Sequence, residues 1–210
     1  MSGGMKACIV IIIVVGVCCL LCCGIFGWLG YSMVPKMSDK PADVDAARDE
    51  IAKMTLPPGF VPKNSGKSDN FAFTLIFAFY ENPGHAALLI GEFSSKMGND
   101  AQMRQQLQMQ RNIHFEPMQN EKSETRPIKI KGHDYKFVFA TGEGHEGVGF
   151  EGRGPRGKGA RGVDKMPGKK IIRHRIEGEF EGNHGLALIV IDFDDTYKEA
   201  DIVKMLENIQ

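Results

Sequence analysis

The stretch FAFTLIFAFYENPGHAALLIGEF, residues 71–93, carries the strongest strand pattern in the chain. Bulky apolar side chains occupy every second position from Phe71 to Phe79, and the positions between them, Ala72 to Tyr80, are also mostly apolar. Since side chains alternate across a strand, both faces of this strand are apolar, which indicates a strand covered on both sides or nearly so. Asn82-Pro83-Gly84 predicts a turn, and Ala86 to Phe93 predicts the second strand of a hairpin.

Further elements lie on both sides of this hairpin. Strands are predicted at 128–131, 135–141, 171–180 and 186–193. Helices are predicted at 41–54, from Gly98-Asn99 to about Arg111, and after Asp194-Asp195-Thr196, whose side chains offer N-caps. The predicted fold class is α+β: an N-terminal transmembrane helix followed by an antiparallel sheet with about three helices packed mainly on one face.

Two of the predicted strands resemble each other at an offset of 100 residues. Residues 87–93 read ALLIGEF and residues 187–193 read ALIVIDF, and a helix is predicted after each segment. An internal duplication is one interpretation. The other is chance, because buried strands are alike in composition.

The N-terminal region predicts attachment to a membrane. Residues 7–31 include no charged side chain and, as a helix, would be roughly 37 Å long, enough to cross a bilayer. A cleaved signal peptide is the alternative, but its apolar core would be shorter. We therefore predict a tail (1–6), a transmembrane signal-anchor (7–31), a linker (32–41) and a soluble α+β domain (42–210). Lys6 precedes the segment while Lys36 and Lys40 follow it, so orientation is nearly balanced; an extracytoplasmic domain is favoured.

All five cysteines lie within this uncharged segment. The predicted soluble domain therefore has no disulfide and no thiol nucleophile. Within the segment, the cysteines are interpreted as small packing residues, with interchain disulfides or S-acylation as alternatives. Gly24, Gly27 and Gly30 would allow two copies to approach closely, so homo-oligomerisation through this segment is a further possibility.

A glycine-rich basic stretch, residues 142–169, is predicted to be a flexible loop between two strands. The segment from Gly152 to Lys158 fits G-x-x-x-x-G-K, but Gly159 follows where a P-loop needs Ser or Thr, and no helix is predicted there. Two interpretations remain: a solvated loop, or a cationic arm that binds anionic lipid, wall polymer or nucleic acid. Nucleic acid is the less favoured partner because aromatic residues are scarce here. The candidate polyanion-binding residues are Arg153, Arg156, Lys158 and Arg161.

The sequence shows no catalytic constellation. The six histidines are scattered without a metal-binding spacing, and no nucleophile elbow is present. Asp192, Asp194 and Asp195 cluster where the last strand ends but lack the spacing of a calcium loop, and helix capping explains Asp194 and Asp195. We therefore predict no catalytic, metal-binding or cofactor-binding residue and no cofactor, and hence a protein that is not an enzyme.

The order of these elements resembles a known fold. A helix, the sequence Pro57-Pro58-Gly59-Phe60, paired strands, a helix, further strands and a terminal helix ending in Met205-Leu206-Glu207-Asn208-Ile209 are similar to the small α+β domains of the PsbP-like type, and to short membrane-anchored bacterial proteins of unknown function. The resemblance covers residues 42–210 and implies no functional residue.

Taken together, these patterns predict a single-pass membrane protein. Its partners would be the bilayer, through residues 7–31, and a protein or an anionic surface contacted by the soluble domain. The overall charge is zero, so no strong field attracts the whole chain to nucleic acid or lipid. Non-enzymatic protein or envelope interaction is the leading hypothesis. Polyanion binding and an enzyme of unrecognised class are the alternatives.

Overall fold

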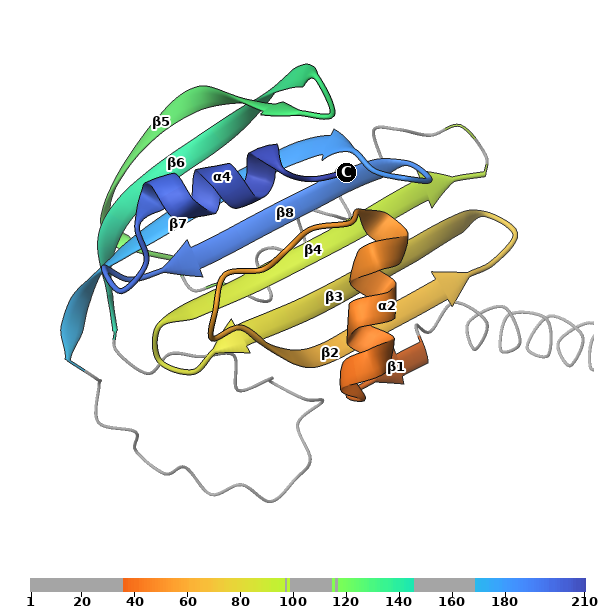
Figure 1. Cartoon of the computed structure of the whole chain (residues 1–210), viewed down its shortest axis with the longest axis horizontal. Coiled ribbons are helices and arrows are strands. Elements are labelled where there is room, and N and C mark those ends of the chain that lie inside the picture. Colours follow the sequence, from red (N-terminus) through yellow and green to blue (C-terminus); the bar gives the residue numbers. More distant parts are fainter. Residues whose placement is uncertain (1–35, 97, 99–114, 116, 146–168) are drawn as a thin grey trace, which may run out of the picture.

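Residues 71–93 contain the hairpin that their apolar pattern predicts (Figure 1). The computed structural model describes residues 36–96, 98, 115, 117–145 and 169–210. The strands of the hairpin are β3 (Phe73–Asn82) and β4 (Ala86–Ser95). They pair antiparallel with Phe79 opposite Leu89. Gly84 has a positive φ of 83°, which a residue without a Cβ adopts at no steric cost, and it closes the turn.

This hairpin lies within one eight-stranded sheet in which every neighbouring pair is antiparallel. The strand order is β1-β2-β3-β4-β8-β7-β6-β5. Two runs of sequential strands, β1–β4 and β5–β8, therefore meet where β4 pairs with β8. The remaining strands are β1 (Lys36–Ser38), β2 (Val61–Asp69), β5 (Gln119–Ile130), β6 (His133–His145), β7 (Lys170–Glu181) and β8 (Leu186–Phe193).

One face of the sheet, here called the helix face, carries both described helices, α2 (Pro41–Ile51) and α4 (Glu199–Glu207) (Figure 1). Val44 and Ile51 of α2, with Ile202 and Leu206 of α4, are fully buried in the main core cluster. The Tyr80 hydroxyl donates to the Asp45 carboxylate at 2.9 Å and so ties α2 to β3. Apolar stripes on the two helices therefore form the core against the sheet.

The opposite face of β3, β4 and β8 is apolar as well. Leu75, Phe79, Leu89 and Val190 are each no more than 7% exposed there. The prediction that the first strand is buried on both faces is confirmed from Leu75 to Tyr80, whereas Phe71, predicted to begin the strand, lies before β3 and is 63% exposed. This burial places the β3-β4-β8 region in the interior of the molecule, since a strand with one solvated face would alternate apolar and polar residues.

The predicted fold class is wrong. The described residues form a single eight-stranded antiparallel sheet with two helices, rather than an α+β fold with about three helices and a transmembrane helix. The strands were undercounted because β1, β2 and most of β5 are polar: β2 reads VPKNSGKSD and β5 begins QNEKSETRP. Such segments lack the apolar alternation that identifies a strand, and their position at or near the sheet edges explains why they can lack it.

Several predicted features lie outside the described residues. These are the segment 7–31, the helix from Asn99 to Arg111 and most of the glycine-rich loop, of which the structure describes 142–145 and 169. Residues 142–145 belong to β6 rather than to a loop. Among the described residues, no helix is long and apolar enough to span a bilayer.

The register of β4 and β8 argues against duplication at an offset of 100. Ile90 pairs with Ile189, and both side chains are in the helix-face core. Val190, which the offset would make equivalent to Ile90, lies in the cluster on the opposite face. Because a shift of one residue moves every side chain to the other face, the two segments are not equivalent at this offset. Their similarity reflects shared burial.

A substitution at Leu88 tests the core, because this side chain of β4 is fully buried in the main core cluster on the helix face. We expect Leu88→Ala to lower the free energy of unfolding by about 2–5 kcal/mol, since it removes apolar contacts and leaves a cavity. Urea denaturation followed by circular dichroism measures the change. Val61→Ala is the matched control, because Val61 is 44% exposed. A loss at Leu88 no larger than that at Val61 would contradict this core.

Candidate binding site on the sheet

A buried cluster of charged side chains lies where β7 and β8 pair, on the face of the sheet opposite the helix face. Arg173 and Arg175 of β7 and Asp192 of β8 are each only 7–8% exposed. Arg173 Nε donates to Asp192 Oδ1 at 2.6 Å, and Arg175 Nη2 donates to Oδ2 at 2.8 Å. Each guanidinium thus takes one oxygen of the same carboxylate. Arg175 and Asp192 are direct partners in the strand register.

The neighbouring strands make room for this cluster. A Cβ at Gly144 of β6 would lie 2.6 Å from Cγ of Arg173, so glycine at this position leaves room for the arginine stem beside β6. Arg173 Nη1 also donates to the His85 carbonyl at 3.2 Å, next to the β3–β4 turn. These contacts hold the Arg173 guanidinium at one position.

The arrangement is electrostatically expensive. Taking three charges out of water costs several kcal/mol per ion, and well-packed apolar residues at such sites are often equally stable or better. The cluster also has two cations for one anion, so its charges do not cancel. Perturbed or desolvated charges beside a cavity mark a candidate functional site. Such a cavity lies next to Arg175.

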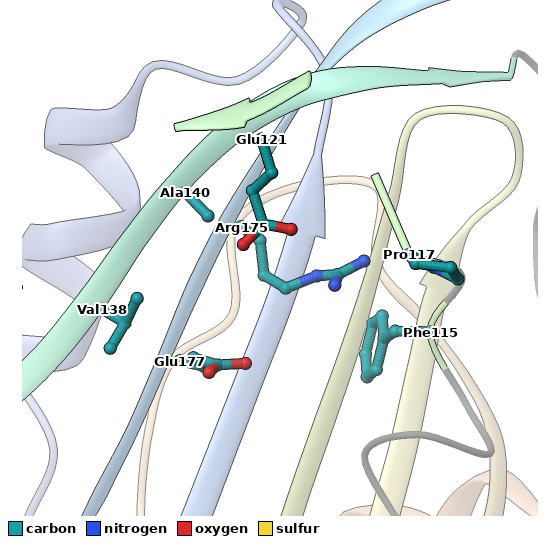
Figure 2. A pocket seen from close by; sticks show the side chains of 7 residues that line it. All are labelled: Phe115, Pro117, Glu121, Val138, Ala140, Arg175 and Glu177. Carbon is teal, nitrogen blue, oxygen red and sulfur yellow. The ribbon is translucent and has the colours of Figure 1, made fainter. Parts of the chain in front are cut away.

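Figure 2 shows this pocket, which has a volume of about 310 Å³. Arg175 extends from β7 across the pocket toward Phe115 and Pro117, and its guanidinium carbon is 5.4 Å from the centre of the Phe115 ring. Val138 and Ala140 of β6 form an apolar wall. Two carboxylates, Glu121 of β5 and Glu177 of β7, also line the pocket.

The pocket offers three kinds of contact. Arg175 supplies a cation, the two glutamates supply anions, and Phe115 with the β6 wall supplies apolar surface. A volume of about 310 Å³ is at the lower end of the range for ligand pockets, which suits a side chain or a small group better than a large cofactor. Among the described residues that line the pocket, none carries a hydroxyl, thiol or imidazole, the groups that most often act as nucleophile or base.

The three aspartates that the sequence places together are separated by their partners. Asp192 faces the two arginines. Asp194 Oδ2 lies 2.9 Å from His85 Nδ1, and Asp195 Oδ1 lies 3.0 Å from His174 Nε2. Burial opposes ionisation of Asp194, but hydrogen bonds from His85 and Thr196 outweigh it and hold the Asp194 pKa below its usual value.

The predicted helix-capping role of Asp194, Asp195 and Thr196 is wrong. The residue at the N-cap of α4 is Lys198, which makes no capping hydrogen bond through its side chain. Asp194 Oδ1 instead accepts from the Thr196 amide at 2.9 Å and forms a local turn. Three residues lie between Asp194 and the cap, so its carboxylate closes this turn before the helix begins.

The other predicted site residues lie elsewhere. Arg153, Arg156, Lys158 and Arg161 are outside the described residues, so polyanion binding stays a prediction. Only the base of their loop is described, where His145 pairs with Lys170. Within the described part of the chain, no group of three or more His, Cys, Asp or Glu side chains could hold a metal ion.

Sequence reasoning missed the pairing of β7 with Asp192. The signal was present: Arg173, Arg175, Glu177 and Glu179 occupy every second position of β7, which predicts one charged face. Identifying their partner requires the strand order, which brings the single carboxylate of β8 opposite Arg175.

A second hollow, of about 660 Å³, lies at the β7–β8 turn. The turn is supported by Glu92 of β4, only 2% exposed, whose Oε1 accepts from the His184 amide at 2.6 Å and the Gly185 amide at 2.8 Å. This carboxylate has a structural role, since it satisfies two backbone donors that the turn leaves unpaired. The pocket beside Arg175 therefore remains the better candidate for binding.

No family model matches the chain, and comparison with curated proteins and with solved structures gives no match either.

Asp192 tests the buried cluster. We expect Asp192→Asn to lower the free energy of unfolding by about 3–5 kcal/mol, because it removes the carboxylate charge that the two buried guanidinium groups share. The matched control is Asp195→Asn, which breaks a pair whose carboxylate is 79% exposed and should cost less than about 1 kcal/mol. Urea denaturation curves of both variants measure the change. Equal losses of unfolding free energy in the two variants would show that the cluster stabilises the fold no more than a surface ion pair does.

Proposed function

We propose that this chain is a membrane-attached, non-enzymatic protein-binding domain, and that the pocket beside Arg175 receives a basic side chain from a partner protein. The observation that carries the proposal is the pocket itself, in which Glu121 and Glu177 stand next to an apolar wall. A lysine or arginine side chain has an apolar stem and a cationic end, which is the combination this lining complements.

The charges of the pocket support a protein partner over a simple ion. Two arginines, Arg173 and Arg175, lie together with three carboxylates, Asp192, Glu121 and Glu177, so the local excess of charge is negative. Phe115 adds an aromatic ring that a cation can contact. A protein segment can present a cation, an apolar stem and backbone carbonyls for Arg175 at once, whereas an inorganic cation uses only the carboxylates.

Membrane attachment rests on the uncharged segment 7–31. We propose that this segment enters the bilayer and that the domain lies outside the cytoplasm, where it would meet proteins of the cell envelope. With segment 7–31 in the bilayer, the sheet would lie close to it, because β1 begins at Lys36, only five residues after Tyr31.

Photocrosslinking in intact cells tests the pocket. We expect a photoreactive residue at Pro117, an exposed position on the rim, to form a specific covalent adduct with a protein. Glu121→Lys should abolish the adduct, because it places a cation where a basic side chain would lie. Glu124→Lys is the matched control: it lies on the same strand but pairs with Arg126 outside the pocket, and the adduct should persist. Absence of the adduct, or its survival in both variants, would refute the proposed site.

Fractionation tests membrane attachment separately. We expect the full chain to remain in the membrane pellet after alkaline carbonate extraction, and a chain lacking residues 7–31 to be released. Protease added to intact cells should digest the C-terminal domain if it is extracytoplasmic. Release of the full chain by carbonate would contradict attachment, and protection from protease in intact cells but not in opened cells would reverse the orientation.

A further inference from the structure

One end of the sheet carries an exposed aromatic residue among lysines. Phe71, in the turn between β2 and β3, is 63% exposed, more than any other large apolar side chain of the described residues. Lys67 and Lys96 lie beside the turn and keep their own side chains about half exposed. A lone exposed phenylalanine is common, so its meaning depends on what lies next to it.

The turn around Phe71 is held rigidly by hydrogen bonds. Asn70 Oδ1 accepts from the amides of Ala72 and Phe73, at 2.9 and 3.0 Å. Lys96 donates through its amide to the Ala72 carbonyl and through Nζ to the Asn70 carbonyl. With the backbone fixed on both sides, the aromatic ring is presented to the outside at little further entropic cost.

The register of β1 places the N-terminal segment at this same end. Lys36 pairs with Lys67, and Ser38 pairs with Ser65, so β1 runs away from the β2–β3 turn. The chain before Lys36 therefore enters the sheet from the side of Phe71. Asn70 lies three residues beyond Lys67, so the turn extends roughly 10 Å farther along the strand direction than Lys36 does.

The linker limits how far this end can be from a bilayer. Tyr31 is the last residue of the uncharged segment, and five residues of extended chain span at most about 17 Å up to Lys36. The Phe71 turn extends toward the side from which the linker comes. An aromatic side chain with flanking lysines is the composition found where proteins contact lipid headgroups.

We infer that the end of the sheet formed by Lys36, Lys67, Phe71 and Lys96 lies against the bilayer that holds the chain, with the Phe71 ring in the headgroup region. The inference rests on the proposed membrane attachment through residues 7–31. The lysine ammonium groups add attraction to anionic headgroups, although Lys67 and Lys96 also pair with Glu50 and Asp69.

A single-tryptophan experiment on the full chain tests this contact. Trp28 is the only natural tryptophan, so Trp28→Phe removes the background, and Phe71→Trp then places the probe at the turn. The matched control is Val61→Trp in the same background, at an exposed position at the other end of β2. Circular dichroism first checks that both proteins have the secondary structure of the unsubstituted chain. They are then reconstituted into vesicles of phosphatidylcholine and phosphatidylglycerol, with and without brominated phosphatidylcholine.

We expect the emission of the probe at position 71 to shift to shorter wavelength and to lose intensity with brominated lipid, while the probe at position 61 changes little. The loss should be greater with phosphatidylglycerol than in pure phosphatidylcholine. Equal quenching at both positions, in chains that remain in the vesicles after carbonate extraction, would overturn the inference and leave membrane attachment intact. Chains that do not remain in the vesicles would refute attachment and the inference with it.

Discussion

The pairing of β4 with β8 joins the two halves of the sheet, and the rest of the fold depends on it. Eight residue pairs, from Ala86 with Phe193 to Phe93 with Leu186, link strands that are about one hundred positions apart in the chain. Each half presents apolar side chains on both faces of its inner strands, so neither can be separated without exposing two apolar layers. Because contacts so distant in sequence must close a long loop, we expect this step to limit the rate of folding.

The sequence predicts the inner part of this sheet well and its outer part poorly. β3, β4, β7 and β8 have continuous or alternating apolar residues, and the structure confirms strands there, with β8 at the predicted bounds. β2 and the first two thirds of β5 are polar, because edge and near-edge strands need less burial and their charges discourage pairing with other chains. A local apolar pattern therefore identifies buried strands and misses polar ones. The fold class was wrong because the polar outer strands were not recognised.

The residues of the candidate site were harder to predict from the sequence than the outer strands, for a different reason. The charged residues of β7 alternate along the strand and predict a polar face, but the sequence gives no indication that Arg173 and Arg175 are buried against Asp192. That contact depends on strand order. The pocket likewise combines β5, β6 and β7 with Phe115, which no local spacing could bring together. Asp194 shows the converse: a plausible local role as a helix cap was wrong because its carboxylate closes a turn before the helix begins and also contacts His85.

The strand register also separates the two functional regions that the sequence suggests. Lys36 lies at the end of the sheet where β7 finishes at Glu181, whereas the glycine-rich basic segment joins the sheet at the opposite end, where His145 pairs with Lys170. A twelve-residue strand such as β7 is roughly 40 Å long. The sheet is thus a rigid spacer whose length is several Debye lengths at physiological salt. Charges fixed at one end, such as Lys36, are consequently screened from charges fixed at the other, such as Lys170, so the two ends of the sheet act electrostatically as separate surfaces.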